Sequence, residues 1–80
     1  MLKDDLLRAI DLAQQDQWDA AHKIVQDIEE PLSYWIHAVL HKIEGDMGNS
    51  QYWYSRAGKN EHFSMQPAAE FDLIRRRLTC

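Results

Sequence analysis

The sequence predicts an all-α fold of about five helices, paired as antiparallel helix–turn–helix units that are tetratricopeptide-like in form. Three observations predict it: apolar residues recur at three- and four-residue steps, no segment alternates as a strand would, and the helical segments are joined by short connections. Eighty residues are enough for one domain, which we assign to residues 1–80. We expect helix pairs at about 2–29 and 31–58 and a C-terminal helix at about 67–78.

The first pair is expected as helices at about 2–15 and 18–29. Asp4 and Asp5 occupy the opening turn of the first helix, where the helix dipole favours anions. Pro31 begins the next unit, because proline has no backbone N–H and suits the first turn of a helix. The apolar stripes are Leu2, Leu6, Ala9, Ile10 and Ala13 in the first helix and Trp18, Ala21, Val25 and Ile28 in the second.

The second pair is expected at about 32–44 and 50–57. Gly45 suits the end of the first of these helices, since glycine takes the left-handed conformation at no steric cost. Either Asp46 or Asn49 can cap the helix that follows, and Gly58 ends it. The apolar face of helix 32–44 comprises Leu32, Trp35, Ile36, Val39, Leu40 and Ile43.

The last helix follows a polar connector at residues 59–66. Its final turn carries three consecutive arginines, which complement the negative end of the helix dipole and are expected to be solvated. The residues expected to face inward are Ala68, Phe71, Ile74 and Leu78.

The composition of the chain excludes some classes of function. A net charge of −4 argues against non-specific nucleic-acid binding, which draws most of its energy from phosphate neutralisation. The single cysteine, Cys80, allows no internal disulfide, and a cytoplasmic location is expected. No run approaches the roughly 20 apolar residues of a membrane span, so we expect no membrane association.

A weak internal repeat relates the two helix pairs at a shift of 30 positions. The shift places Leu6, Ala9, Ile10 and Ala13 on Ile36, Val39, Leu40 and Ile43, and a period near 30 with two helices per unit is typical of a helical solenoid. Any protein built of helical hairpins can give the same overlay by chance.

One segment carries a family resemblance. Ser50, Trp53, Tyr54 and Ala57 have the spacing of the second helix of tetratricopeptide-like repeats, and the segment most resembles the Sel-like subclass. The resemblance covers about one repeat, and it implies a helix pair that binds another protein. The preceding helix departs from the pattern, because His37, Ala38 and His41 stand where the family usually has a Leu-Gly pair and a tyrosine.

A second resemblance covers residues 35–46, W-I-H-A-V-L-H-K-I-E-G-D. A similar segment occurs in a group of small uncharacterised bacterial proteins. This resemblance implies no activity.

The sharpest candidates for chemistry are His37, His41 and Glu44. On a helix they lie within about 60° of one another, on a face that points away from the apolar one. Two imidazoles at positions i and i+4 can bind one divalent metal ion such as zinc, and Glu44 can supply a third ligand. The zinc-protease motif is not present, because Ala38 stands where that motif has glutamate. The alternative is a hydrogen-bonded aromatic face that only packs against a neighbouring helix.

Tyr52 and Arg56 share the other face of their helix, at a spacing that permits a cation–π pair. We expect a surface made by His37, His41, Glu44, Tyr52 and Arg56 to bind a protein partner or a second copy of the chain. The sequence thus predicts a small protein-interaction or self-association module without catalytic residues. The alternative is a metal- or small-ligand-binding protein that uses His37, His41 and Glu44.

Overall fold

Five α-helices and one short 3₁₀ helix make up the chain in a computed structural model that describes residues 2–80. The helices are α1 (Leu2–Gln14), α2 (Trp18–Val25), α3 (Pro31–Glu44), α4 (Met47–Ala57) and α5 (Pro67–Thr79), and the 3₁₀ helix η1 (Asn60–His62) lies between α4 and α5. The residues described form no strand, so the all-α prediction is confirmed.

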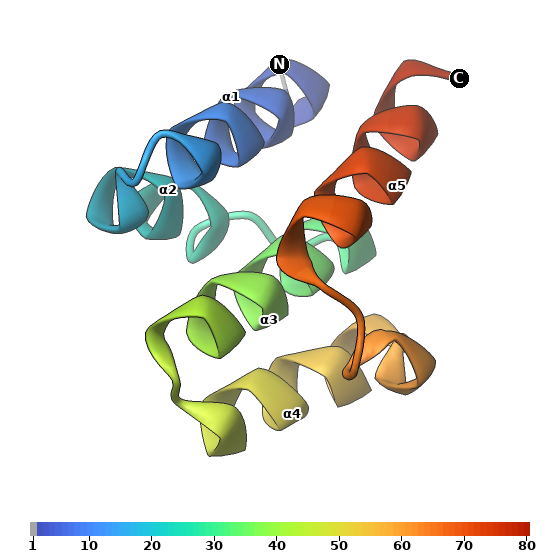
Figure 1. Cartoon of the computed structure of the whole chain (residues 1–80). Coiled ribbons are helices and arrows are strands. Elements are labelled where there is room, and N and C mark those ends of the chain that lie inside the picture. Colours follow the sequence, from blue (N-terminus) through green and yellow to red (C-terminus); the bar gives the residue numbers. More distant parts are fainter. Residues whose placement is uncertain (1) are drawn as a thin grey trace.

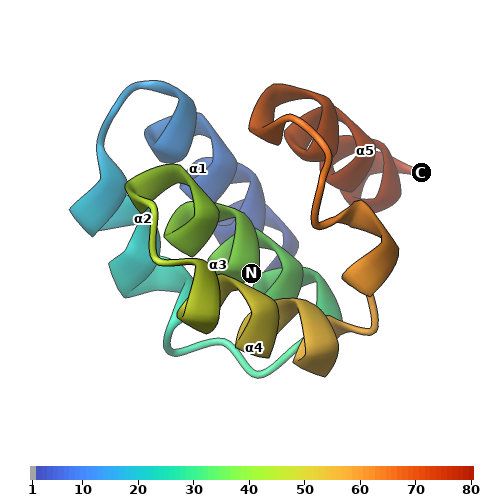
Figure 2. The ribbon, with the colours of Figure 1, turned by 60° about the horizontal axis from the view of Figure 1, so that its bottom comes forward.

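Helix α3 lies at the centre of the fold (Figure 1). It contacts each of the other four α-helices, while α1 packs on α2 and on α5. Viewed from below, α2 and α4 lie on either side of α3 (Figure 2). Helix α3 therefore supplies more of the core than any other helix, with Trp35, Ile36, Val39 and Leu40 fully buried.

The turn between α3 and α4 forms as its residues predict. Gly45 has a φ of +88°, and its N–H and that of Asp46 bond to carbonyls of the last turn of α3. Asp46 is the cap, because its carboxylate accepts hydrogen bonds from the Asn49 backbone N–H (3.3 Å) and from Asn49 Nδ2 (2.7 Å). This cap lets α4 begin at Met47, three residues before the predicted start at Ser50.

Helix α2 is shorter than predicted. It ends at Val25 rather than near Glu29, and a turn at Gln26–Asp27 follows. The Ser33 hydroxyl donates to the Val25 carbonyl (3.0 Å), and the Ile28 N–H donates to the same oxygen (3.2 Å). These bonds take up the carbonyl that a longer α2 would use, and the chain turns towards α3.

Three residues expected in the core are exposed. Leu2 and Ile43 are 49% and 46% exposed, and Ala68 is also exposed. Ile43 and Ala68 border one shallow cavity of about 320 Å³ between the end of α1 and the start of α5, and Leu2 borders another of about 360 Å³. Their side chains stay open because neighbouring helices do not close over these cavities.

A buried ion pair that the sequence did not suggest fixes α5 to α3 and α4. The fully buried Glu70 carboxylate accepts hydrogen bonds from Trp35 Nε1 (3.0 Å), Tyr54 Oη (2.5 Å) and Lys42 Nζ (2.5 Å). Burial, followed by the hydrogen bond to Glu70, raises the pKa of Tyr54, which keeps this phenol protonated as a donor. Lys42 Nζ also donates to backbone carbonyls of the connector, at Phe63 (2.9 Å) and Met65 (2.8 Å).

None of the helices between Leu2 and Cys80 combines the length and the hydropathy that a membrane span requires.

Candidate metal centre

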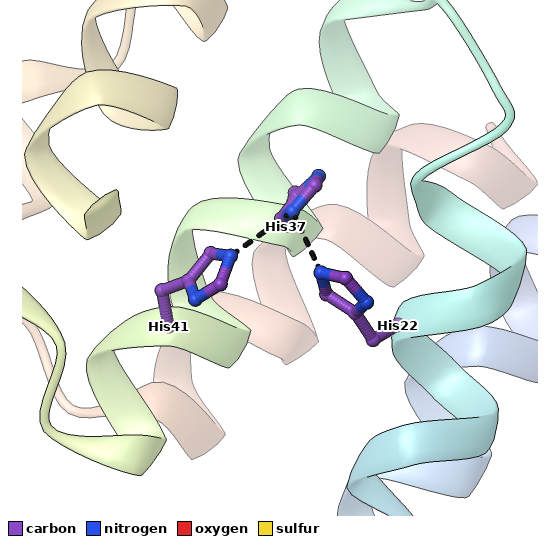
Figure 3. A group of neighbouring side chains, drawn as sticks. All are labelled: His22, His37 and His41. Carbon is purple, nitrogen blue, oxygen red and sulfur yellow. Dashed lines mark hydrogen bonds between the residues drawn. The ribbon is translucent and has the colours of Figure 1, made fainter.

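Three histidine side chains meet between α2 and α3 (Figure 3). His37 and His41 lie one turn apart on α3, and His22 reaches them from the middle of α2. His37 Nε2 is 3.1 Å from His22 Nε2 and 3.1 Å from His41 Nε2. One ring nitrogen from each residue lies within 4.8 Å of the other two. We call His22, His37 and His41 the three-histidine cluster.

The cluster is covered rather than open. His37 is 4% exposed and His41 is 8% exposed, while His22 is half-buried. Helix α2 and two indole rings cover this side of α3, so little of His37 or His41 lies on the surface. That these residues take part in a protein-binding surface stays a prediction. Their assignment as metal ligands stays a prediction.

Two tryptophans stack on the imidazoles. Trp18 stacks on His22 with ring centroids 4.8 Å apart and planes 10° apart, and Trp53 stacks on His37 at 4.0 Å and 13°. Trp18 Nε1 donates to the Leu40 carbonyl (2.7 Å), which fixes its ring against α3. The indoles hold the imidazole rings in place and keep water from their faces.

Glu44 orients His41. Its carboxylate accepts a hydrogen bond from His41 Nδ1 at 2.7 Å. A neutral imidazole carries one proton, and this bond places that proton on Nδ1. His41 Nε2 then presents a lone pair to the cluster, as a metal ligand requires. Glu44 thus contacts His41 Nδ1 and fixes the orientation of its ring, while its role as a third metal ligand stays a prediction.

The protons in the cluster are too few for its contacts. Both close contacts involve His37 Nε2, which can carry only one proton, and His41 Nε2 has none to offer. His22 Nε2 can carry a proton too, but protons on both His22 Nε2 and His37 Nε2 would set two donors against each other. Only one of the two contacts can therefore be a good hydrogen bond when all three rings are neutral. His37 Nδ1 is also buried, without a hydrogen-bond partner among residues 2–80. A cation that accepts several lone pairs would satisfy the three converging nitrogens better than a shared proton, and it would leave His37 Nδ1 without a partner.

Electrostatics keep two rings of the cluster, those of His22 and His37, uncharged. Burial, and then the neighbouring His22 and His41, lowers the pKa of His37 to about 3. Burial and His41 lower the pKa of His22, although the nearby acids Glu44 and Asp19 oppose that shift. Both rings are therefore neutral at pH 7, and neutral imidazole is the form that binds metals.

The spacing of the nitrogens suits one metal ion. Two imidazole nitrogens bound to a tetrahedral zinc ion at about 2.0–2.1 Å lie roughly 3.3 Å apart. The two close pairs of the cluster, at 3.1 Å, need to open by only a few tenths of an ångström. Three nitrogen ligands leave one position of a tetrahedral ion for water or another small ligand.

The other predicted site residues lie apart from the cluster. Tyr52 and Arg56 are exposed on α4. His41, Glu44 and Asp46 also come within 4.8 Å of one another, but the Asp46 carboxylate is bound to Asn49 and the His41–Glu44 contact is the hydrogen bond described above.

The member of the three-histidine cluster that the sequence did not identify is His22. It lies on the flank of the α2 stripe, and its distance of 15 residues from His37 carries no periodic signal. Only the pairing of α2 with α3 brings it to the cluster.

Both cavities described above lie away from the cluster, and neither has a histidine in its lining. The cluster accordingly suits an ion better than an organic molecule. Comparison with models of protein families, with curated proteins and with experimentally determined structures found no match to this chain.

Proposed function

We propose that this protein binds one divalent transition-metal ion through His22, His37 and His41. The observation that supports the proposal is the convergence of three ring nitrogens with too few protons to bond one another. Imidazole ligands suit zinc, copper and nickel. Among the described residues no thiolate lies near the cluster, since the single cysteine, Cys80, is the exposed last residue. Glu44 holds His41 in the ligating tautomer, and Trp18 and Trp53 hold the other two rings.

Metal binding of this kind stabilises the fold. The ion joins α2 to α3, and a ligand that binds only the folded state at 100 times its Kd adds about 2.7 kcal/mol of stability. For a domain of this size, that gain corresponds to a rise of about 10–20 °C in Tm. Trp18 and Trp53 contact the cluster rings, so their fluorescence should report the binding of nickel or copper.

The test is calorimetric titration of the metal-free protein with zinc, nickel and copper chlorides, combined with thermal unfolding. We expect one ion per chain and a higher Tm with at least one of the metals. The His22→Gln variant should lose most of this response, because it removes one of the three ligands. Since His22 is only half-buried, the replacement should leave the core intact.

The matched control is His62→Gln, since His62 stacks on Trp35, away from the cluster. An unchanged response in the His22 variant, or its loss in the control, would contradict the proposal.

Tetratricopeptide-like pairing is a further part of the proposal. The Ser50 hydroxyl donates to the Ala38 carbonyl (2.8 Å), so α4 approaches α3 closely at the small residue of the pattern. Tyr54 is fully buried, and Leu6, Ala9 and Ile10 are buried like their counterparts Ile36, Val39 and Leu40. These contacts support a repeat of two helix pairs. A protein partner remains our second proposal, on a surface that does not include His37 and His41.

A further inference from the structure

Arg56 is held on the surface of α4 by three aromatic rings. Its guanidinium carbon lies 4.7 Å from the centre of the Tyr34 ring, 5.2 Å from that of Trp53 and 5.8 Å from that of Tyr52. Arg56 is exposed, and Tyr52 is 54% exposed. The guanidinium is thus fixed in position but faces solvent. We call Tyr34, Tyr52, Trp53 and Arg56 the Arg56 surface.

The hydrogen-bond donors of this surface are only partly used. A guanidinium carries five N–H donors and no acceptor, and two of its donors reach the phenol oxygens of Tyr52 (3.3 Å) and Tyr34 (3.4 Å). Each phenol oxygen accepts from Arg56, so each hydroxyl proton is free to donate elsewhere. Arg56 forms no ion pair with any acidic group of residues 2–80. Several donors of one positively charged group therefore converge without an anion.

We propose that the Arg56 surface binds a carboxylate of an acidic peptide segment on a protein partner. An arginine fork matches the two oxygens of a carboxylate, and the phenol hydroxyls can donate to the same group. The exposed ring of Tyr52 and the half-buried ring of Trp53 supply apolar area beside it, as is common at the centres of protein interfaces. The proposal does not require a bound metal, although Trp53 belongs to this surface and also stacks on His37.

A singly charged carboxylate fits better than a phosphate dianion. The hydrogen bond that Arg56 donates to the Tyr52 phenol oxygen is the main cause that raises the pKa of Arg56, and the charge of Glu29 adds to it, so an acidic side chain already lies nearby. The chain as a whole has a net charge of −4. Both features repel a doubly charged ligand more strongly than a singly charged one.

The test uses a synthetic twelve-residue peptide of alternating glutamate and serine, and the same peptide with glutamine in place of glutamate. Binding is followed by NMR at the Arg56 side-chain Nε–H and the Trp53 indole N–H of the full chain. We expect saturable shifts with the glutamate peptide and none with the glutamine peptide. Arg56→Gln should weaken binding about tenfold, because the charge-assisted hydrogen bonds are lost.

The matched control is Arg76→Gln, which removes the same charge from an exposed position on α5. This variant should weaken binding less than twofold. Tyr34→Phe and Tyr52→Phe keep the rings, and each should weaken binding severalfold if its hydroxyl donates to the peptide. Absence of saturable shifts, equal losses in the two arginine variants, or tighter binding of inorganic phosphate than of the peptide would overturn the proposal.

Discussion

Replacing Lys42 with methionine tests the buried ion pair that joins α3 to α5. The replacement leaves the Glu70 carboxylate, which is fully buried, without its cation. Removing one partner of a buried ion pair costs about 3–5 kcal/mol. At about 0.05–0.15 kcal/mol per residue, a domain of this length has a free energy of unfolding of roughly 4–12 kcal/mol. The Lys42→Met variant should therefore lose about a quarter or more of its stability, and its Tm should fall by about 12–40 °C.

A second substitution shows whether the unpaired Glu70 carboxylate causes the loss of stability. In Lys42→Met/Glu70→Gln the side chain at position 70 is neutral but keeps an oxygen acceptor for Trp35 Nε1 and Tyr54 Oη. This double variant should recover about 2 kcal/mol relative to Lys42→Met, since a buried amide costs less than an unpaired carboxylate. Urea unfolding followed by circular dichroism gives both values. A loss below about 1 kcal/mol in the single variant, or a further loss in the double variant, would refute the reasoning.

Three further predictions concern acid stability and the turn before α4. In metal-free protein, the pKa of His37, about 3 when folded, lies below its ordinary value of 6.5, so the unfolded chain binds a proton first as the pH falls. Stability should therefore fall below pH 6.5, by about 1–2 kcal/mol at pH 5 after allowance for solvent screening, and urea unfolding of His37→Phe should show a smaller pH dependence. Asp46→Ala should cost about 1 kcal/mol in urea unfolding through loss of the helix cap, and an unchanged midpoint would contradict the capping role. Gly45→Ala should lower the free energy of unfolding by about 1 kcal/mol, because the φ of Gly45 is positive. Gly48→Ala should raise it, because Gly48 lies within α4 and an added Cβ meets no atom. Thermal unfolding should therefore give a lower Tm for the first variant and a higher Tm for the second.

Local pattern predicted much of the fold. The stripes of α1 and α3 and the turn at Gly45 depend on residues close together in sequence, and the structure confirms them except at Leu2 and Ile43. Ile43 shows the limit of such patterns, because its exposure depends on where the ends of α1 and α5 lie. Charged residues such as Lys42 and Glu70 read as surface residues in a sequence, and only tertiary packing supplies the partners that let them be buried.

Residue spacing predicted part of the candidate metal centre. The pair His37 and His41 follows from the helical period, and so does the proximity of Glu44. The third histidine comes from another helix, and the role of Glu44 depends on which nitrogen of His41 it contacts. Neither fact has a signature in residue spacing. Burial of the cluster beneath Trp18 and Trp53 likewise follows from the packing of α2 and α4 around α3.

The most direct test of the metal proposal is an NMR spectrum that resolves the ring nitrogens of all four histidines before and after one equivalent of zinc. The account predicts metal-bound shifts at Nε2 of His22, His37 and His41, with the proton of His41 remaining on Nδ1 beside Glu44, and no change at His62. Unchanged shifts of the three-histidine cluster, or coordination that involves His62 instead, would contradict it.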